Sequence, residues 1–132
     1  MKFCYVDITA GTNVSSVFAH YRETIAALQH EYPGVAFVHV TVPLTTDSPG
    51  DNVAREKYNS LVRQQYADSG RLFDLAVIES TRPDGTRVSG SQDGATYYAL
   101  YSGYASDNGH LNDRGARAAA AGLLDVMAHA AG

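Results

Sequence analysis

The chain has 132 residues, of which 45% are hydrophobic and 18% are charged, as in an ordinary globular protein, so we assign residues 1–132 to one domain. The formal net charge is −4 and the only lysines are Lys2 and Lys57, which disfavours a nucleic-acid partner. No apolar run is long enough to cross a membrane, and the N-terminus lacks the layout of a signal peptide. Because Cys4 is the only cysteine, an internal disulfide and a cysteine-based zinc site are excluded. A cytoplasmic location is the default expectation, unless a leader was removed.

Three short apolar runs rich in β-forming residues predict strands over residues 2–8, 35–42 and 72–79. The second run, VAFVHVTV, is almost continuously apolar, as expected of a strand buried on both faces. A helix is predicted between the first two strands, capped by Thr12 or Asn13 and stopped at Pro33-Gly34. Its apolar face consists of Val14, Val17, Phe18, Tyr21, Ile25, Leu28 and Tyr32.

Two further helices are predicted. The first follows the loop PLTTDSPGDN, is capped by Asp51 or Asn52 and ends at Ser69-Gly70. The last helix runs from about Asn112 to His129, after a long polar segment with a turn at Asp84-Gly85. The apolar faces of these helices are Val53, Tyr58, Leu61, Val62 and Tyr66, and then Ala116, Ala119, Leu123, Val126 and Met127.

This alternation of strands and helices predicts parallel βαβ units with right-handed crossovers. In such sheets, functional groups gather beyond the carboxyl ends of the strands. The loops at that end would be residues 9–13, 43–51 and 80–110. The third is long for a loop without secondary structure, which is typical of a functional segment.

The segment SDNGHLNDRG closes that long loop and holds an acid and an imidazole three residues apart. In a tight turn, Asp107 can accept a hydrogen bond from Nδ1 of His110 and fix the tautomer of the ring. Asn112 can cap the following helix, and Gly115 would let that helix approach its neighbours closely. The alternative to an acid–base pair is that Asp107 only shapes the turn and His110 is a surface residue near the start of the helix. A metal site is not expected, because this pair supplies only two ligands.

SDNGHLNDRG resembles the C-terminal D-x-x-H-L-N block of the SGNH (GDSL-like) esterase and lipase superfamily. The segments YRETIAALQHEYPGVAFVHVTVPL and NVAREKYNSLVRQQYADSGRLFDLAVIES are similar to two helix–strand segments of the same family. The resemblance implies a three-layer, flavodoxin-like α/β fold with a parallel sheet, truncated here to about three βα units. It also implies hydrolysis of carboxyl esters or of O-acetyl groups on sugars without a cofactor. Asp107 would be the orienting acid and His110 the general base.

The chain departs from the family pattern at the nucleophile, because the sequence contains no G-D-S motif. The family's serine precedes the matched region, so this chain would begin at the third strand of the fold. The candidate nucleophiles that remain are Ser15, Ser16 and Cys4. Serines at these positions more often cap or pack the start of a helix, and a cysteine within a strand more often behaves as a small buried hydrophobe. His110 could instead activate water directly. The alternative function is an inactive fragment or remnant that serves as a dimeric binding or structural domain.

A second departure concerns the oxyanion hole, where the resemblance places CYVD at the family's G-x-N-D block. Asp7 matches the final acid, but Val6 replaces the asparagine and cannot donate a hydrogen bond. Asn13, in a G-x-N-like triplet beyond the strand end, is the other oxyanion candidate. Tyr101 and Tyr104 either line a substrate pocket or pack the long loop down.

Two expectations concern packing. His39 lies in a strand predicted to be buried, where a hydrogen-bonded core histidine is expected more often than a catalytic one. The strand over residues 2–8 would be an uncovered sheet edge in the truncated fold. We therefore predict a homodimer in which two such edges pair antiparallel.

Overall fold

The computed structural model describes residues 2–131. Its helices are α1 (Val14–Glu31), α2 (Pro49–Tyr66), α3 (Leu75–Ser80) and α4 (Asp113–Ala131). A parallel pair is formed by β1 (His39–Val40) and β2 (Leu72–Phe73), and an antiparallel hairpin by β3 (Ser89–Gln92) and β4 (Ala95–Tyr98). Three 3₁₀ turns complete the list: η1 (Tyr5–Asp7), η2 (Ala67–Ser69) and η3 (Ser102–Tyr104).

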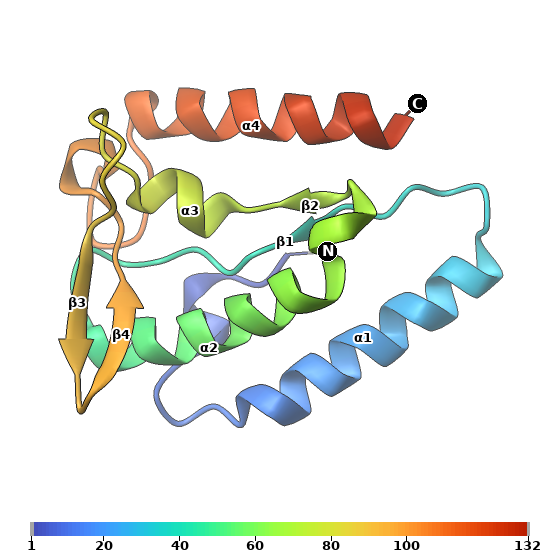
Figure 1. The fold of residues 1–132 in the computed structure, drawn as a ribbon, viewed down its shortest axis with the longest axis horizontal. Coiled ribbons are helices and arrows are strands. Elements are labelled where there is room, and N and C mark those ends of the chain that lie inside the picture. Colours follow the sequence, from blue (N-terminus) through green and yellow to red (C-terminus); the bar gives the residue numbers. More distant parts are fainter. Residues whose placement is uncertain (1, 132) are drawn as a thin grey trace.

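The parallel pair lies between helices. α4 packs on β2 from one side, and α1 and α2 lie on the other side, where α2 packs on β1 and Tyr21 of α1 is hydrogen-bonded to His39 of β1 (Figure 1). The chain is therefore an α/β protein with a small parallel sheet, which confirms the coarse fold class predicted from the sequence. Within the described residues, no helix combines the length and the apolar character needed to span a membrane.

The strand predictions are only partly correct. Residues 2–8 contain the η1 turn instead of a strand, and the strand predicted over 35–42 reduces to β1. The strand predicted over 72–79 ends after β2 and continues as α3. Asp74 starts that helix, because its side chain accepts a hydrogen bond from the backbone N–H of Val77 at 3.3 Å. A short apolar run does not distinguish a buried strand from a buried helical turn.

Side chains of α2 replace a neighbouring strand along the extended segment that follows β1. The Asn59 side chain accepts from the N–H of Val42 at 2.7 Å and donates to its carbonyl at 2.9 Å. Asn52 makes the same pair of bonds with Thr45, at 3.1 and 2.9 Å. The side-chain amides satisfy the hydrogen bonds of these backbone groups. The segment can therefore stay extended without pairing with a strand beyond β1.

The helix predictions agree with the structure better than the strand predictions do. The α1 helix starts at the predicted cap, where Oδ1 of Asn13 accepts from the N–H of Ser16 at 3.1 Å. The α2 helix begins earlier than predicted, at Pro49, because proline suits the first helical turn. Gly70 ends this region as predicted, in the left-handed conformation with φ of 66°.

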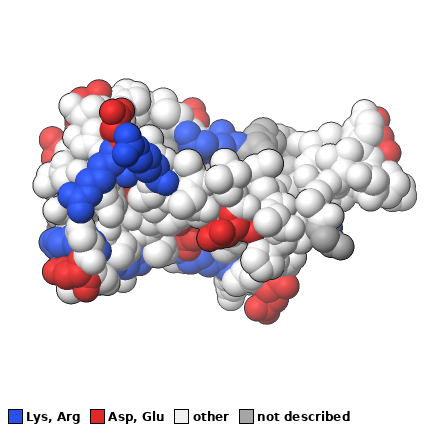
Figure 2. Space-filling model, turned by 90° about the horizontal axis from the view of Figure 1, so that it is seen from above, with Lys and Arg blue, Asp and Glu red and all other residues white. Residues whose placement is uncertain are grey.

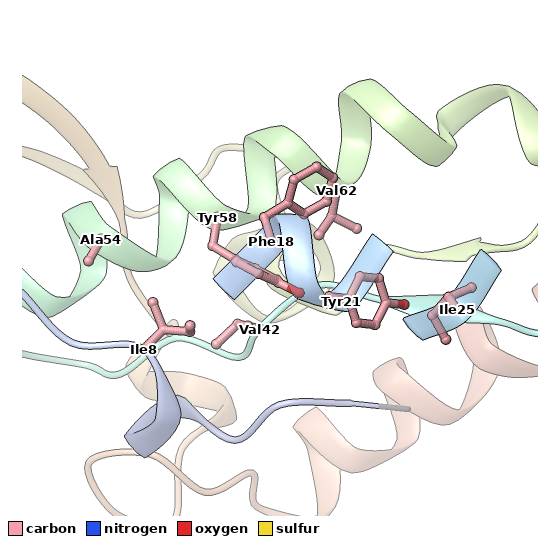
Figure 3. Close-up of a cluster of buried hydrophobic side chains, with 8 residues drawn as sticks. All are labelled: Ile8, Phe18, Tyr21, Ile25, Val42, Ala54, Tyr58 and Val62. Atoms are coloured by element: carbon pink, nitrogen blue, oxygen red, sulfur yellow. The ribbon is translucent and has the colours of Figure 1, made fainter. Parts of the chain in front are cut away.

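The main core lies where α1 and α2 meet the extended segments around residues 8 and 42 (Figure 3). The apolar face predicted for α1 supplies three buried side chains to this core. The buried cluster consists of Ile8, Phe18, Tyr21, Ile25, Val42, Ala54, Tyr58 and Val62.

The α4 helix is anchored mainly at its start. Oδ1 of Asn112 accepts from the N–H groups of Arg114 and Gly115, each at 3.0 Å, as the predicted cap would. A β-carbon at Gly115 would lie 2.6 Å from the carbonyl oxygen of Tyr104, so the predicted close approach is confirmed. The later apolar face is only partly covered, and Met127 is 52% exposed. Figure 2 views this side of the molecule, where Lys and Arg atoms gather toward one end and much of the remaining surface is uncharged.

Candidate functional site

The loop that carries the candidate acid–base pair is closed by short-range contacts. Ala105 and Leu111 form an isolated antiparallel bridge, and the N–H of Ser106 donates to the carbonyl of His110 at 2.8 Å. Leu111 packs against a small core of Leu44, Ala76 and Leu100. The loop is thus fixed at both ends, directly before α4.

Within this loop, Asp107 and His110 are in contact, as predicted. Nδ1 of His110 lies 2.8 Å from Oδ2 and 2.9 Å from Oδ1 of Asp107. An ionised carboxylate only accepts hydrogen bonds, so in the neutral ring Nδ1 carries the proton and Nε2 keeps the lone pair. The two side chains are 59% and 65% exposed, so this pair is open to solvent.

The backbone of the turn also holds the acid. Oδ1 of Asp107 accepts from the N–H groups of Gly109 and His110, each at 2.9 Å. Hydrogen bonds lower the pKa of the Asp107 carboxyl below its ordinary value. The largest effect comes from the Gly109 N–H, followed by the imidazole and the N–H of His110. Asp107 therefore stays ionised at neutral pH and can orient the ring.

The loop is tied to the segment after β1. The backbone N–H of Thr46 donates to the carbonyl of Asn108 at 2.9 Å, and the Thr46 hydroxyl donates to Oδ1 of Asn108 at 2.8 Å. On the other side, the ring of Tyr5 meets the imidazole of His110 edge-on, with centroids 5.7 Å apart. The imidazole is therefore held between the N-terminal segment and its own turn.

His110 lines a cavity of about 220 Å³ between the N-terminal segment, the loop and α3. Cys4, Tyr5, Pro43 and Glu79 are also among the residues that line this cavity. The Cys4 thiol is exposed. Among residues 2–131, no hydroxyl or thiol is hydrogen-bonded to Nε2 of His110.

The two candidate serines lie at other cavities. Ser15 lines a space of about 510 Å³ between the start of α1, α2 and the hairpin, together with Asn13. Ser16 lines a separate apolar cavity beside Phe3 and His20. The structure therefore brings Cys4, and neither serine, to the cavity of His110.

The other residues predicted for the pocket have local roles. Oδ2 of Asp7 accepts from the N–H of Cys4 at 2.6 Å and holds the η1 turn, while Asn13 caps α1. Tyr101 and Tyr104 pack edge-on, with ring centroids 5.1 Å apart. None of these four residues lines the cavity of His110. Val6, where the resemblance would place the SGNH asparagine, is 62% exposed.

Glu79 is the residue whose importance sequence reasoning underestimated. Residue 79 is the last of the strand predicted over 72–79, but Glu79 lies in α3, where only 3% of its surface is exposed. One carboxyl oxygen accepts from the N–H of Leu44. The only sign of this environment in the sequence is that an acid ends an apolar run. This sign is weak, because the position of the partner Leu44 depends on the tertiary fold.

Burial makes the Glu79 carboxyl an unusually weak acid. Desolvation raises the pKa of its carboxyl to about 8, although the Leu44 N–H and the charges of Lys2 and Arg55 act in the opposite direction. At neutral pH the carboxyl is therefore mostly protonated. The cavity thus combines a neutral acid with an imidazole whose Nε2 makes no hydrogen bond within residues 2–131.

Comparison with protein-family models, curated proteins and solved structures finds no match to this chain. The resemblance to the SGNH family therefore rests on the quoted sequence segments alone. No group of three or more His, Cys, Asp and Glu side chains that could hold a metal ion occurs in residues 2–131.

Proposed function

We propose that this chain is an SGNH-type hydrolase of small carboxyl esters or O-acetyl groups, with a truncated flavodoxin-like fold, in which Asp107 and His110 form the acid–base pair. The observation that carries this proposal is the 2.8 Å contact between Nδ1 of His110 and Oδ2 of Asp107, at the edge of a cavity. The contact leaves Nε2 as a base, which is what removal of a proton from a nucleophile requires.

The reaction that fits this geometry starts with water. Nε2 of His110 takes a proton as the water oxygen bonds to the acyl carbon, and Asp107 stabilises the imidazolium that forms. The C–O bond to the alcohol then breaks, and the imidazolium returns the proton to the leaving oxygen. The Cys4 thiol, in the same cavity, is the alternative nucleophile, and it would form a thioester that water hydrolyses.

Hydrolysis of p-nitrophenyl acetate by the purified chain tests this function. We expect His110→Ala to lower kcat/KM by about 100-fold or more, because the general base is lost. Asp107→Asn should lower kcat/KM by at least about tenfold, because the amide no longer selects the correct tautomer.

His129→Ala is the matched control, because this exposed histidine also has Nδ1 in a hydrogen bond, 2.7 Å from the carbonyl of Asp125. Its rate should equal that of the wild type. Equal rates for wild type, H110A and H129A would contradict the proposal. Cys4→Ala decides between the two nucleophiles, since the water mechanism predicts an unchanged rate.

A second candidate function is a non-catalytic domain derived from such an esterase. It is favoured by one observation: no hydroxyl or thiol of residues 2–131 is hydrogen-bonded to Nε2 of His110. This alternative predicts that the rate does not depend on His110.

A further inference from the structure

The proposed hydrolysis lacks a group for the charge that develops on the carbonyl oxygen. When water attacks the acyl carbon, that oxygen becomes negative and requires a hydrogen-bond donor. The family's asparagine is replaced by Val6, whose side chain is 62% exposed and has no polar atom. Asn13, the other candidate from the sequence, lines a different cavity.

Glu79 is placed to fill this role. Glu79, in α3, lines the cavity of His110 together with Cys4 of the N-terminal segment. One carboxyl oxygen accepts from the N–H of Leu44, and Leu44 is the only hydrogen-bond partner of this carboxyl among residues 2–131. The second oxygen of the carboxyl therefore has no hydrogen-bond partner within residues 2–131, and Glu79 is part of the cavity wall.

We propose that Glu79, as a neutral carboxylic acid, donates a hydrogen bond to the carbonyl oxygen of an acyl substrate bound beside His110. This inference rests on the function proposed above and adds a catalytic residue to it. The proton stays on Glu79 throughout: the π electrons of the carbonyl move to its oxygen during attack and return when the C–O bond to the alcohol breaks.

The charge environment supports this assignment. Glu79 is 3% exposed, and burial disfavours its ionised form so strongly that its pKa rises to about 8. The positive groups that act on it are Lys2, from the N-terminal segment, and Arg55, from α2. The other titratable groups at the cavity wall are Cys4, Tyr5 and His110.

The experiment compares the wild type with Glu79→Gln between pH 6 and 10. Glutamine keeps an oxygen for the N–H of Leu44 and offers an amide donor that does not titrate. In the wild type, the His110-dependent kcat/KM should fall about tenfold for each pH unit above 8, since the carboxylate cannot donate. In E79Q this alkaline decrease should be absent. Superimposable pH profiles for the two proteins would overturn the inference.

Binding of acetate, followed by NMR on the intact chain, separates this inference from the proposed hydrolase. Acetate affinity should fall as the pH rises through 8 in the wild type and stay constant in E79Q. If this difference is seen without any His110-dependent hydrolysis, Glu79 is a donor and the hydrolase proposal fails. If acetate does not bind and the rates do not depend on His110, both proposals fail. Circular dichroism at each pH verifies that the chains remain folded.

Discussion

Two histidines of this chain show how residue type alone leaves function open. Nδ1 of His110 faces a carboxylate at a solvent-exposed turn, whereas Nδ1 of His39 lies 2.8 Å from the Tyr21 hydroxyl and its ring stacks on Tyr66 at 3.5 Å. His39 is 1% exposed, as expected of a core histidine. Burial is the main reason why the pKa of His39 is lowered to about 4.

His39 should make folding sensitive to acid. Its ordinary pKa is 6.5, so between about pH 6.5 and 4 the unfolded chain binds a proton that the folded chain does not. This contribution to stability is complete above pH 6.5 and is lost as the pH falls. At pH 5, the wild type should therefore lose about 2 kcal/mol relative to His39→Gln, which keeps an acceptor for the Tyr21 hydroxyl.

Urea unfolding of both proteins at pH 7.5 and pH 5 measures this difference. His129→Gln, at an exposed helical position, is the control and should follow the wild type. A wild type and an H39Q variant that lose equal stability on acidification would contradict the buried, neutral state of His39.

At the residue scale, the sequence allowed the Asp107–His110 contact and the buried histidine to be predicted. The contact is local, since three residues separate the partners, and the histidine lies within an apolar run. The environment of Glu79 could not be predicted, because its hydrogen-bond partner Leu44 is 35 residues away. Sequence spacing carries information about neighbours in the chain and very little about contacts of this kind.

At the scale of elements, helices were easier to predict than strands. The capping residue and apolar spacing of α1 lie within the helix itself. A strand depends on the backbone of a partner, and here Asn52 and Asn59 take the place of that partner along the segment after β1. Their spacing of seven residues places both on one face of α2, a polar pattern that the stronger apolar pattern of this helix obscured.

The amide of Asn59 should therefore be essential for the fold. In Asn59→Ala, the N–H and carbonyl of Val42 both lose their buried partner. We expect a loss of about 2–4 kcal/mol in the free energy of unfolding. Chemical denaturation measures it, and Ser60→Ala, at the adjacent exposed position, should stay within about 0.5 kcal/mol of the wild type. A similarly small effect for N59A would show that water can replace the amide.

At the scale of the whole molecule, the homodimer stays a prediction. In this structure it would require residues 2–8 to change conformation before two edges could pair. Pairing through residues 2–8 needs an extended edge, but this segment forms η1, and the Arg55 guanidinium Nε donates to the carbonyls of Tyr5 and Ile8, each at 3.1 Å. Antiparallel pairing would have to open the η1 turn. Conformational rearrangement lowers the apparent affinity.

We therefore expect a monomer at low protein concentration, with dimers only at high concentration. Size-exclusion chromatography with light scattering over a range of concentrations measures this equilibrium. A dimer that persists at the lowest concentration would contradict the expectation. In that case, substitution of Val6 by Lys, which places a charge on the proposed edge, would show whether residues 2–8 form the interface.

The buried acid at the cavity also affects how the whole chain responds to alkali. Glu79 keeps its proton in the folded state up to about pH 8, whereas its ordinary pKa is 4.5, so folding takes up a proton between these values. Folding releases a proton at His39 between about pH 6.5 and 4. The two effects oppose each other below pH 6.5, and above it Glu79 acts alone. Conformational stability should thus decline across neutrality, in the same pH range in which Glu79 would cease to act as a donor.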